Sequence, residues 1–364
     1  MAYWDATSLA GIPDWPRIRA RYEAWWRDEL AGPLLRVTAP REPAAPAPDP
    51  APSDAAGLLD WFMNPEQVLP RLERDFARTY HAGDSFPVLF PVWPGLPAIE
   101  SAYLGAPYSI IPGANTGWAS PLIEDWDRCP PLTVDPQNPW WRKSQRLLDL
   151  GAAQGAGRWV AAIPDLQGGG HIVAELRGAE RLSIDLYEHP EAVKRAIEAV
   201  NVAWWRYYQD CFAIIHRYQA GYVDWLGVWS DTPAVTVECD YSTMISPAMF
   251  DEFFLPALIQ QTEWVGRTVY HLDGPQEIPH LESILAVPRL GAIQWVPLPG
   301  QRTSDWIPLL QRIQAAGKRL VLHCAPEEVK GLLRALRPDG LLISTGCATP
   351  AEAEALVAET MHNT

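Results

Sequence analysis

Eight short apolar runs recur along the chain, and amphipathic helical segments separate most of them. The runs cover residues 86–92, 158–163, 222–229, 234–239, 267–271, 291–296, 319–323 and 340–345. Most are almost continuously apolar, which is typical of parallel strands covered on both faces. Eight strands alternating with helices predict an α/β protein with a (β/α)₈ TIM barrel. A doubly wound sheet is the alternative, but no glycine-rich phosphate-binding turn follows the first run.

Two of the helical segments begin with a capping sequence. Ser246 precedes Pro247 and Thr349 precedes Pro350, so a hydroxyl at the N-cap is followed each time by proline at the first helical position. We therefore expect helices to begin at both places. The runs 222–229 and 234–239 are too close for a helix between them, which makes this pair the least regular part of the pattern.

The first 74 residues are expected to form an N-terminal helical extension, and residues 75–364 the barrel. An amphipathic pattern predicts a helix from Asp14 to about Glu29, and residues 33–40 have the composition of a short strand. Residues 40–57, "PREPAAPAPDPAPSDAAG", are rich in proline and alanine and are expected to form a loop.

Charge and cysteine content exclude several classes of protein. The chain of 364 residues has a net charge of −15, which argues against nucleic acid or an anionic membrane as its main partner. Five scattered cysteines do not suggest a disulfide framework. The sequence begins without a signal-peptide pattern, and no apolar segment approaches the ~20 residues of a membrane span. We expect a soluble, cytoplasmic enzyme that acts on a small molecule.

Barrel enzymes carry their chemistry at the carboxyl ends of the strands. His271 and Asp273 follow one strand, and Cys347 follows the last. These residue types suit a zinc site with three protein ligands and an open fourth position. The alternative is structural: Asp273 would cap the turn at Gly274-Pro275, and His271 would be a hydrogen-bonded residue of the rim.

Other polar residues fall at strand ends as well. Glu238 and Asp240 are two residues apart, hence on one side of a strand, and could divide acid and base roles. Alternatively, they only lead into the helix after Ser246. His323 and Cys324 are adjacent and point to opposite faces, which argues against a thiol–imidazole pair. The remaining candidates for substrate contacts are Asp165, His323, Trp93, Trp118 and Trp295, and the glycines 168–170 would let backbone approach a ligand closely.

Four segments together resemble the uroporphyrinogen decarboxylase superfamily. They are "YVDWLGVW…ECDYSTMISPAMFDEFFLP", "YHLDG", "AIQWVPLPG" and "STGCATPAEAEALV", and the run 246–256 is the most specific of them. The likeness extends from about Asp75 to the C-terminus. The superfamily fold is a (β/α)₈ barrel, and the group includes zinc methyltransferases that move methyl groups between corrinoid proteins and thiols such as coenzyme M.

The sequence departs from the decarboxylase branch of this superfamily. That branch has an arginine-rich N-terminal motif, which has no counterpart here. It also has an aspartate after the first barrel strand, where this chain has Val92 and Trp93, and an aspartate before the tryptophan of the sixth strand, where this chain has Gln294. We therefore do not expect decarboxylation of uroporphyrinogen itself.

The methyltransferase branch fits the residues better. Its zinc ligands correspond to His271, to Asp273 in place of a cysteine, to Gln294 in place of an acid, and to Cys347. The resemblance thus implies zinc on His271, Asp273 and Cys347, with Gln294 as a poorer candidate ligand. Within such a site we expect Glu238 or Asp240 to position the substrate or accept a proton. The resemblance also implies methyl transfer between a corrinoid (cobalamin) carrier and a zinc-activated thiol or similar acceptor.

Two alternatives stay open at this point: a decarboxylase-like lyase acting on another carboxylate, and a non-catalytic barrel that binds a corrinoid or tetrapyrrole. The expected partners are a small-molecule substrate and a corrinoid protein. A homodimer is also considered.

Overall fold

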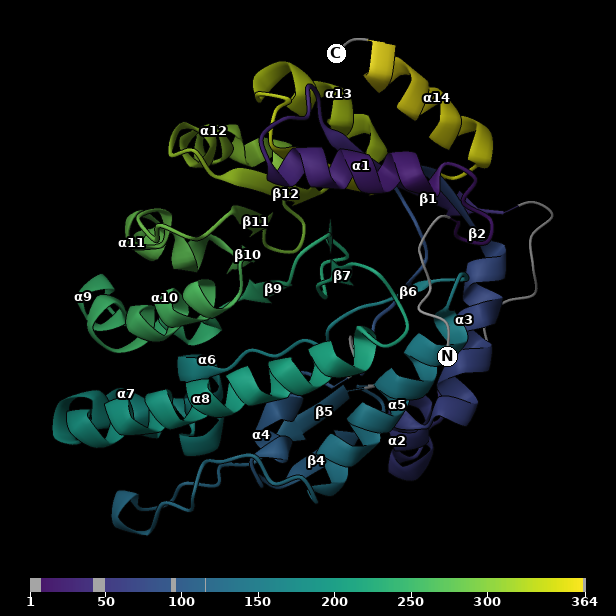
Figure 1. Cartoon of the computed structure of the whole chain (residues 1–364). Coiled ribbons are helices and arrows are strands. Elements are labelled where there is room, and N and C mark those ends of the chain that lie inside the picture. Colours follow the sequence, from purple (N-terminus) through teal and green to yellow (C-terminus); the bar gives the residue numbers. More distant parts are fainter. Residues whose placement is uncertain (1–7, 42–49, 93–95, 115, 363–364) are drawn as a thin grey trace.

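The computed structural model describes residues 8–41, 50–92, 96–114 and 116–362. Its main sheet has seven strands in the order β2-β1-β13-β12-β11-β10-β9. Neighbouring strands are parallel except for the antiparallel pair β1–β2. Their bounds are β1 Leu34–Pro40, β2 Thr79–Gly83, β9 Ala234–Val237, β10 Arg267–Asp273, β11 Ala292–Val296, β12 Arg319–His323 and β13 Leu341–Gly346. The protein is a mixed α/β protein with a parallel sheet (Figure 1).

Shorter strands extend this order beyond β9. They are β3 Val88–Leu89, β6 Val160–Ala161, β7 Tyr222–Val223 and β8 Trp229–Ser230, and a separate hairpin consists of β4 Tyr108–Ile111 and β5 Thr116–Ala119. β3 pairs with β6 in parallel. The N–H of Ile163, just after β6, donates to the carbonyl of Val223 in β7, and β7 lies against β9. The strands therefore continue from β9 through β7 and β6 to β3.

The helices follow the strands, as the alternation predicted (Figure 1). Their bounds are α1 Trp15–Trp26, α2 Ala55–Met63, α3 Pro65–Arg78, α4 Ile99–Tyr103, α5 Pro139–Gly155, α6 Gly169–Arg177, α7 Ala179–Glu188, α8 Pro190–Ile215, α9 Pro247–Met249, α10 Leu255–Trp264, α11 Leu281–Leu285, α12 Ile307–Ala315, α13 Pro326–Ala335 and α14 Pro350–His362. Short helical turns η1 Trp126–Arg128, η2 Asp240–Met244, η3 Phe250–Phe254, η4 Pro275–His280 and η5 Thr303–Trp306 lie between them. α12 packs against β12, α13 against β13, and α14 against β1 and β2.

Both predicted capping sequences are confirmed. The Ser246 hydroxyl accepts from the N–H of Met249 at the start of α9. The Thr349 hydroxyl accepts from the N–H of Glu352 at the start of α14. These bonds satisfy helix N–H groups that would otherwise have no partner.

The expected strand over residues 222–229 is wrong as a continuous strand. It breaks after Val223, where the side chain of Asp224 accepts from the N–H of Val228 and its carbonyl accepts from the N–H of Gly227. The chain therefore turns, and β7 and β8 pair in antiparallel fashion. Gly227 has a φ of +76°, which glycine adopts at low cost.

Hydrophobic side chains form two clusters, one on each face of the strands. The inner cluster contains Leu34, Val88, Val160, Val269, Ala292, Val321 and Leu342 from the strands, together with Trp15, Ile18, Tyr22 and Trp25 from α1. The outer cluster contains alternate residues of the same strands, including Tyr270, Ile293 and Ile343, and the apolar faces of the surrounding helices. Because successive strand side chains point to opposite faces, cluster membership shows which way each strand residue points.

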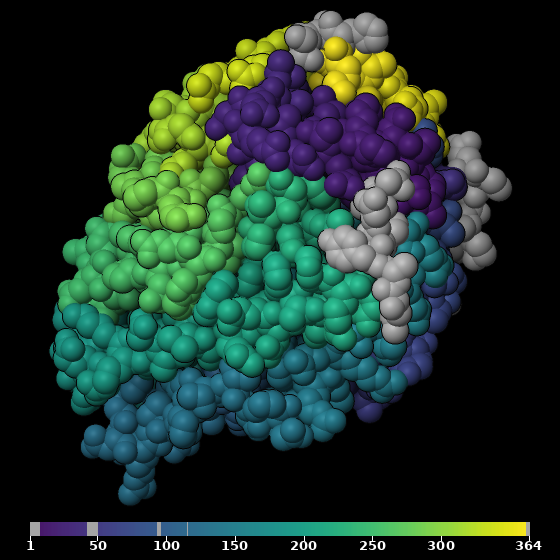
Figure 2. Space-filling model, in the orientation of Figure 1, coloured from purple at the N-terminus to yellow at the C-terminus, as the bar shows by residue number. Residues whose placement is uncertain are grey.

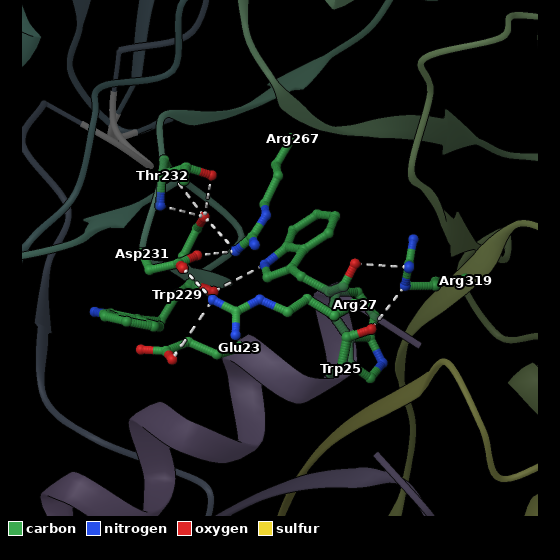
Figure 3. A network of polar contacts seen from close by, with 10 residues as sticks. Glu23, Trp25, Arg27, Trp229, Asp231, Thr232, Arg267 and Arg319 are labelled. Atoms are coloured by element: carbon green, nitrogen blue, oxygen red, sulfur yellow. Dashed lines mark hydrogen bonds and ion pairs between the residues drawn. The ribbon is translucent and has the colours of Figure 1, made fainter. Parts of the chain in front are cut away.

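Helix α1 is held against the amino ends of β10 and β12 by arginines at those ends (Figure 3). Arg319, the first residue of β12, donates to the carbonyls of Trp25 and Trp26 at 2.8 Å each. A cation is favourable there because carbonyls accumulate at a helix C-terminus. Arg267, the first residue of β10, and Arg27 both pair with Asp231.

In the space-filling view, α1 (purple) lies between the yellow C-terminal segments and the green-teal central ones (Figure 2).

Residues 1–74 were expected to form a helical extension, but the strand β1 within them pairs with β13 inside the main sheet. Within the described residues, no helix combines the length and the apolar character needed to cross a membrane.

Candidate metal and substrate site

His271 and Asp273 point to the inner face at the carboxyl end of β10. Val269 belongs to the inner cluster, whereas Tyr270 and Leu272 belong to the outer one. Strand alternation then places His271 and Asp273 on the side of Val269. Side chains of both residues lie at the strand end, where the sequence had placed them.

Gln294 is the hydrogen-bond partner of His271. The two residues are register partners on β10 and β11, and the Nδ1 atom of His271 is hydrogen-bonded to Oε1 of Gln294. An amide oxygen can only accept, so Nδ1 carries the proton and Nε2 keeps its lone pair. Such a bond orients a histidine for metal binding. Gln294 therefore contacts the Nδ1 side of the His271 ring and leaves the Nε2 side for a ligand.

Two groups of side chains are arranged so that each could hold a metal ion. Asp240, His271 and Asp273 form the more open group, and His171, Glu238 and Asp240 form the buried one. In each group the ligand atoms lie within 4.8 Å of one another. Asp240 belongs to both groups, so the two form one continuous constellation.

The loop before α6 brings Gln167 to Glu238, and the first turn of α6 brings His171 there. The amide of Gln167 donates to Oε1 of Glu238, and Nδ1 of His171 lies 3.6 Å from the same oxygen. The N–H of Asp240 lies 3.4 Å from Nδ1 of His171. Glu238 and His171 are only 4% and 8% exposed. Sequence reasoning missed His171, although its position after three glycines at a strand end was a usable signal.

The glycines 168–170 are close to protein side chains. A Cβ at Gly168 would come within 2.6 Å of the Trp204 ring, and one at Gly170 within 1.9 Å of Phe254. These glycines were expected to let the backbone approach a ligand, but the groups that approach them closely are protein side chains. The glycines let the first turn of α6 pack against α8 and η3, which places His171 in the site.

Carboxyl groups crowd this region and shift one another's protonation. Burial and the neighbouring Asp240 raise the pKa of Asp165 to about 7. Burial, with Asp165 and Asp240 nearby, holds the pKa of Glu238 well above its usual range. Burial and Asp240 raise the pKa of Glu277 to about 9. A bound cation would offset this repulsion.

The oxygens of the site fit a metal ion. Oδ1 of Asp240, Oδ1 of Asp165 and Oε1 of Gln167 are buried without a hydrogen-bond partner. Buried polar atoms nearly always have a partner, so such a group points to an ion or a water. Imidazole and carboxylate are donors that zinc accepts, and they also suit manganese and iron.

A cavity of about 440 Å³ lies beside β1, the last residue of β12 and the carboxyl end of β13. Arg36, His81, His323 and Ser344 line it, together with Leu226 and Gly227. Arg36 donates to Oγ of Ser344 at 2.8 Å and to the carbonyls of Leu226 and Gly227 at 2.8 and 2.6 Å. Burial and Arg36 lower the pKa of His323, which favours its neutral form.

Trp225 relates this cavity to the His271 group. Its ring meets the imidazole of His271 edge-on at 5.1 Å, and the next two residues, Leu226 and Gly227, line the cavity. The residue in contact with His271 is thus the sequence neighbour of residues that line the cavity. His323, expected as a substrate contact, lies in the cavity wall.

Several other candidates lie elsewhere. Cys347 belongs to neither group and packs against the outer cluster. Trp295 belongs to the outer cluster and packs against Trp306 in a tilted arrangement, with the ring centroids 4.9 Å apart. Trp118, on the β4–β5 hairpin, is 62% exposed. Trp93 lies outside the described residues. Cys324 is buried in the outer cluster, so His323 and Cys324 point apart, as expected.

Comparison with known proteins supports the fold. No protein-family model and no curated protein sequence matches this chain. Among solved structures, a methyltransferase from Methanosarcina mazei is similar, with a TM-score of 0.59 and 12% sequence identity. The match covers 95% of this chain and 98% of that one. At this identity the likeness concerns the fold alone, and the chain shares its fold with an archaeal methyltransferase.

Proposed function

We propose that this protein is a metal-dependent methyltransferase of the uroporphyrinogen decarboxylase superfamily. The observation that carries the proposal is the convergence of Asp240, His271 and Asp273 at strand ends, with Nε2 of His271 left free by the bond to Gln294. The shared fold with a methyltransferase supports it.

The proposal includes a closed (β/α)₈ barrel. The order β3-β6-β7-β9 continues through the main sheet to β13 and β1. The strands β3, β6, β7, β10, β11, β12 and β13 contribute side chains to one inner cluster. A sheet that closes on itself produces such an enclosed core. The candidate metal groups then lie at the carboxyl end of the barrel, where barrel enzymes have their active sites.

Asp240, His271 and Asp273 would hold zinc in this reaction. When bound there, zinc would lower the pKa of a thiol acceptor and favour its nucleophilic anion. Gln294 keeps His271 in the required tautomer. Glu238, fixed by Gln167, would position the acceptor or take up its proton. The cavity beside Arg36 would hold the remainder of the acceptor.

The methyl donor in this proposal is a corrinoid, either free or bound to a partner protein. The test is a methyl-transfer assay with methylcobalamin and a panel of small thiols. The loss of methylcobalamin absorbance measures the reaction. Wild-type protein loaded with zinc should react, and His271→Ala and Asp273→Ala should not. Zinc-loaded protein that leaves methylcobalamin intact with every thiol would overturn the proposal.

A decarboxylase-like lyase is the second candidate, and the position of Arg36 favours it. An arginine in a cavity wall suits a carboxylate substrate. Carbon dioxide release from a small carboxylate by metal-free protein would support this function and exclude the first. Binding of a corrinoid without turnover in either assay would support the non-catalytic alternative.

A further inference from the structure

We propose that the site binds two divalent cations, with the carboxylate of Asp240 bridging them. One cation is held by His271 and Asp273, and the second by His171 and Glu238. The second position is a metal site in addition to the one used in the proposed methyl transfer. The inference rests on that proposed function only for the first cation.

The geometry of Asp240 carries this inference. Each group has its ligand atoms within 4.8 Å, and Asp240 is the member common to both. A carboxylate has two oxygens and can therefore contact two ions, and paired metal ions in enzymes lie about 3.5–4 Å apart. Oδ1 of Asp240 is buried and has no hydrogen-bond partner in the described structure.

The buried position has the features of a prepared ligand set. Glu238 is 4% exposed, and the amide of Gln167 fixes its Oε1. This bond orients the carboxylate as an outer partner orients a metal ligand. Gln167 is 7% exposed, and its own Oε1 is buried without a partner. An unpartnered buried oxygen beside Glu238 needs a cation or a donor to satisfy it.

The charge of the surrounding carboxyl groups is compatible with two divalent cations. Asp165, Glu238, Asp240 and Asp273 could contribute four negative charges, and two divalent ions would neutralise them. Oδ1 of Asp165 is also buried without a hydrogen-bond partner in the described structure.

The ligand types define the class of metal. Each position offers one imidazole and two carboxylates, counting the shared Asp240 in both. This mixture suits zinc, manganese or ferrous iron and is poor for copper(I), which prefers sulfur. Manganese is the most useful probe because its electron paramagnetic resonance spectrum reports a second ion nearby.

The test uses the full chain, stripped with chelator and titrated with manganese chloride. Elemental analysis should find two ions per chain, and the spectrum should show a spin-coupled pair. His171→Ala should bind one uncoupled ion, and so should His271→Ala. Asp240→Asn should lose the coupling. His189→Ala, at an exposed histidine before α8, should bind two.

The outcomes separate this inference from the proposed function. One ion per chain that His171→Ala leaves in place would overturn the second position and preserve the first. One ion that is lost with His171→Ala but kept with His271→Ala would overturn both. The ion count and the spectrum of the wild-type protein test the paired site without any variant, so a folding defect in His171→Ala cannot obscure the result. His171→Gln provides a milder substitution.

Discussion

Nδ1 of His271 and Oε1 of Gln294 are hydrogen-bonded across a register pair of β10 and β11. By the sequence resemblance, Gln294 stands at the position of an acidic zinc ligand in the methyltransferases that the chain resembles. The structure gives the residue a different role, because the amide oxygen fixes the tautomer of His271 and the orientation of its ring. A glutamine can do this, whereas it is a poor ligand for zinc.

Removing this bond should weaken metal binding without removing a ligand. Gln294→Leu leaves Nδ1 without an acceptor, and loss of such a partner typically costs 10–100-fold in metal affinity. Gln294→Glu should retain most of the affinity, because a carboxylate also accepts from Nδ1. Competition titration with a zinc chelator measures both. Gln154→Leu, at an exposed position in α5, serves as the control. Equal affinities for Gln294→Leu and this control would contradict the role.

Cys347 and His271 should differ in their effect on the metal. Cys347→Ala should keep the wild-type metal content, because its side chain packs against the outer cluster and joins neither candidate group. His271→Ala should lose an ion. Metal analysis after dialysis against metal-free buffer gives the answer. If Cys347→Ala also loses metal, the zinc set implied by the sequence resemblance is correct and Asp240 is not the third ligand.

The sequence predicted four neighbouring strands of the main sheet well because each is a mainly apolar run, but β2, Thr79–Gly83, was not expected. β10, β11, β12 and β13 begin and end within two residues of the expected bounds. It failed at residues 222–229, where the turn depends on the hydrogen bond from Val228 to Asp224. Apolar composition alone could not reveal a turn made by one buried carboxylate.

For the site, the sequence predicted that His271 and Asp273 lie at the end of one strand, because an apolar run followed by polar residues is local information. His171 depends on the packing of α6 against Trp204 and Phe254, which no local pattern reports. Trp295 was expected near the substrate because it lies near a strand end, yet it faces the side opposite to its neighbour Gln294, since adjacent residues of a strand face opposite sides. The sequence contained that information, because the alternation of side chains along the strand excludes Trp295 from the face of Gln294.

Arg36 should contribute strongly to stability. It joins β1 to Ser344 of β13 and to the carbonyls of Leu226 and Gly227. Arg36→Met leaves these acceptors without donors, and each unsatisfied buried group costs about 1–3 kcal/mol. We expect a total loss of about 2–4 kcal/mol in the free energy of unfolding, measured by urea titration.

Arg36→Lys should lose less, because an ammonium group can still donate to one or two of these acceptors. The control is Arg334→Met on the exposed face of α13, which should change stability by less than about 0.5 kcal/mol. A loss for Arg36→Met no larger than that of this control would show that the three bonds contribute little.

Glu100 should make the folded protein less stable as the pH rises. Burial raises the pKa of Glu100 to about 8, and its Oε2 accepts from the N–H of Gly168. In the unfolded chain the same group titrates near its ordinary value of about 4.3. Between these two pKa values the folded state holds a proton that the unfolded state has released. Raising the pH therefore favours unfolding, and the effect is complete above pH 8.

Glu100→Gln should remove this dependence, because an amide resembles the protonated acid and still accepts from Gly168. Relative to wild type, the variant should gain about 2–4 kcal/mol between pH 5 and pH 8.5. Urea titrations across this range measure the difference, and other titrating groups cancel in it. Glu180→Gln, at an exposed position in α7, should show no such trend. A constant difference between Glu100→Gln and wild type would mean that Glu100 is already ionised in the folded protein, with a cation or donor near its unpartnered Oε1.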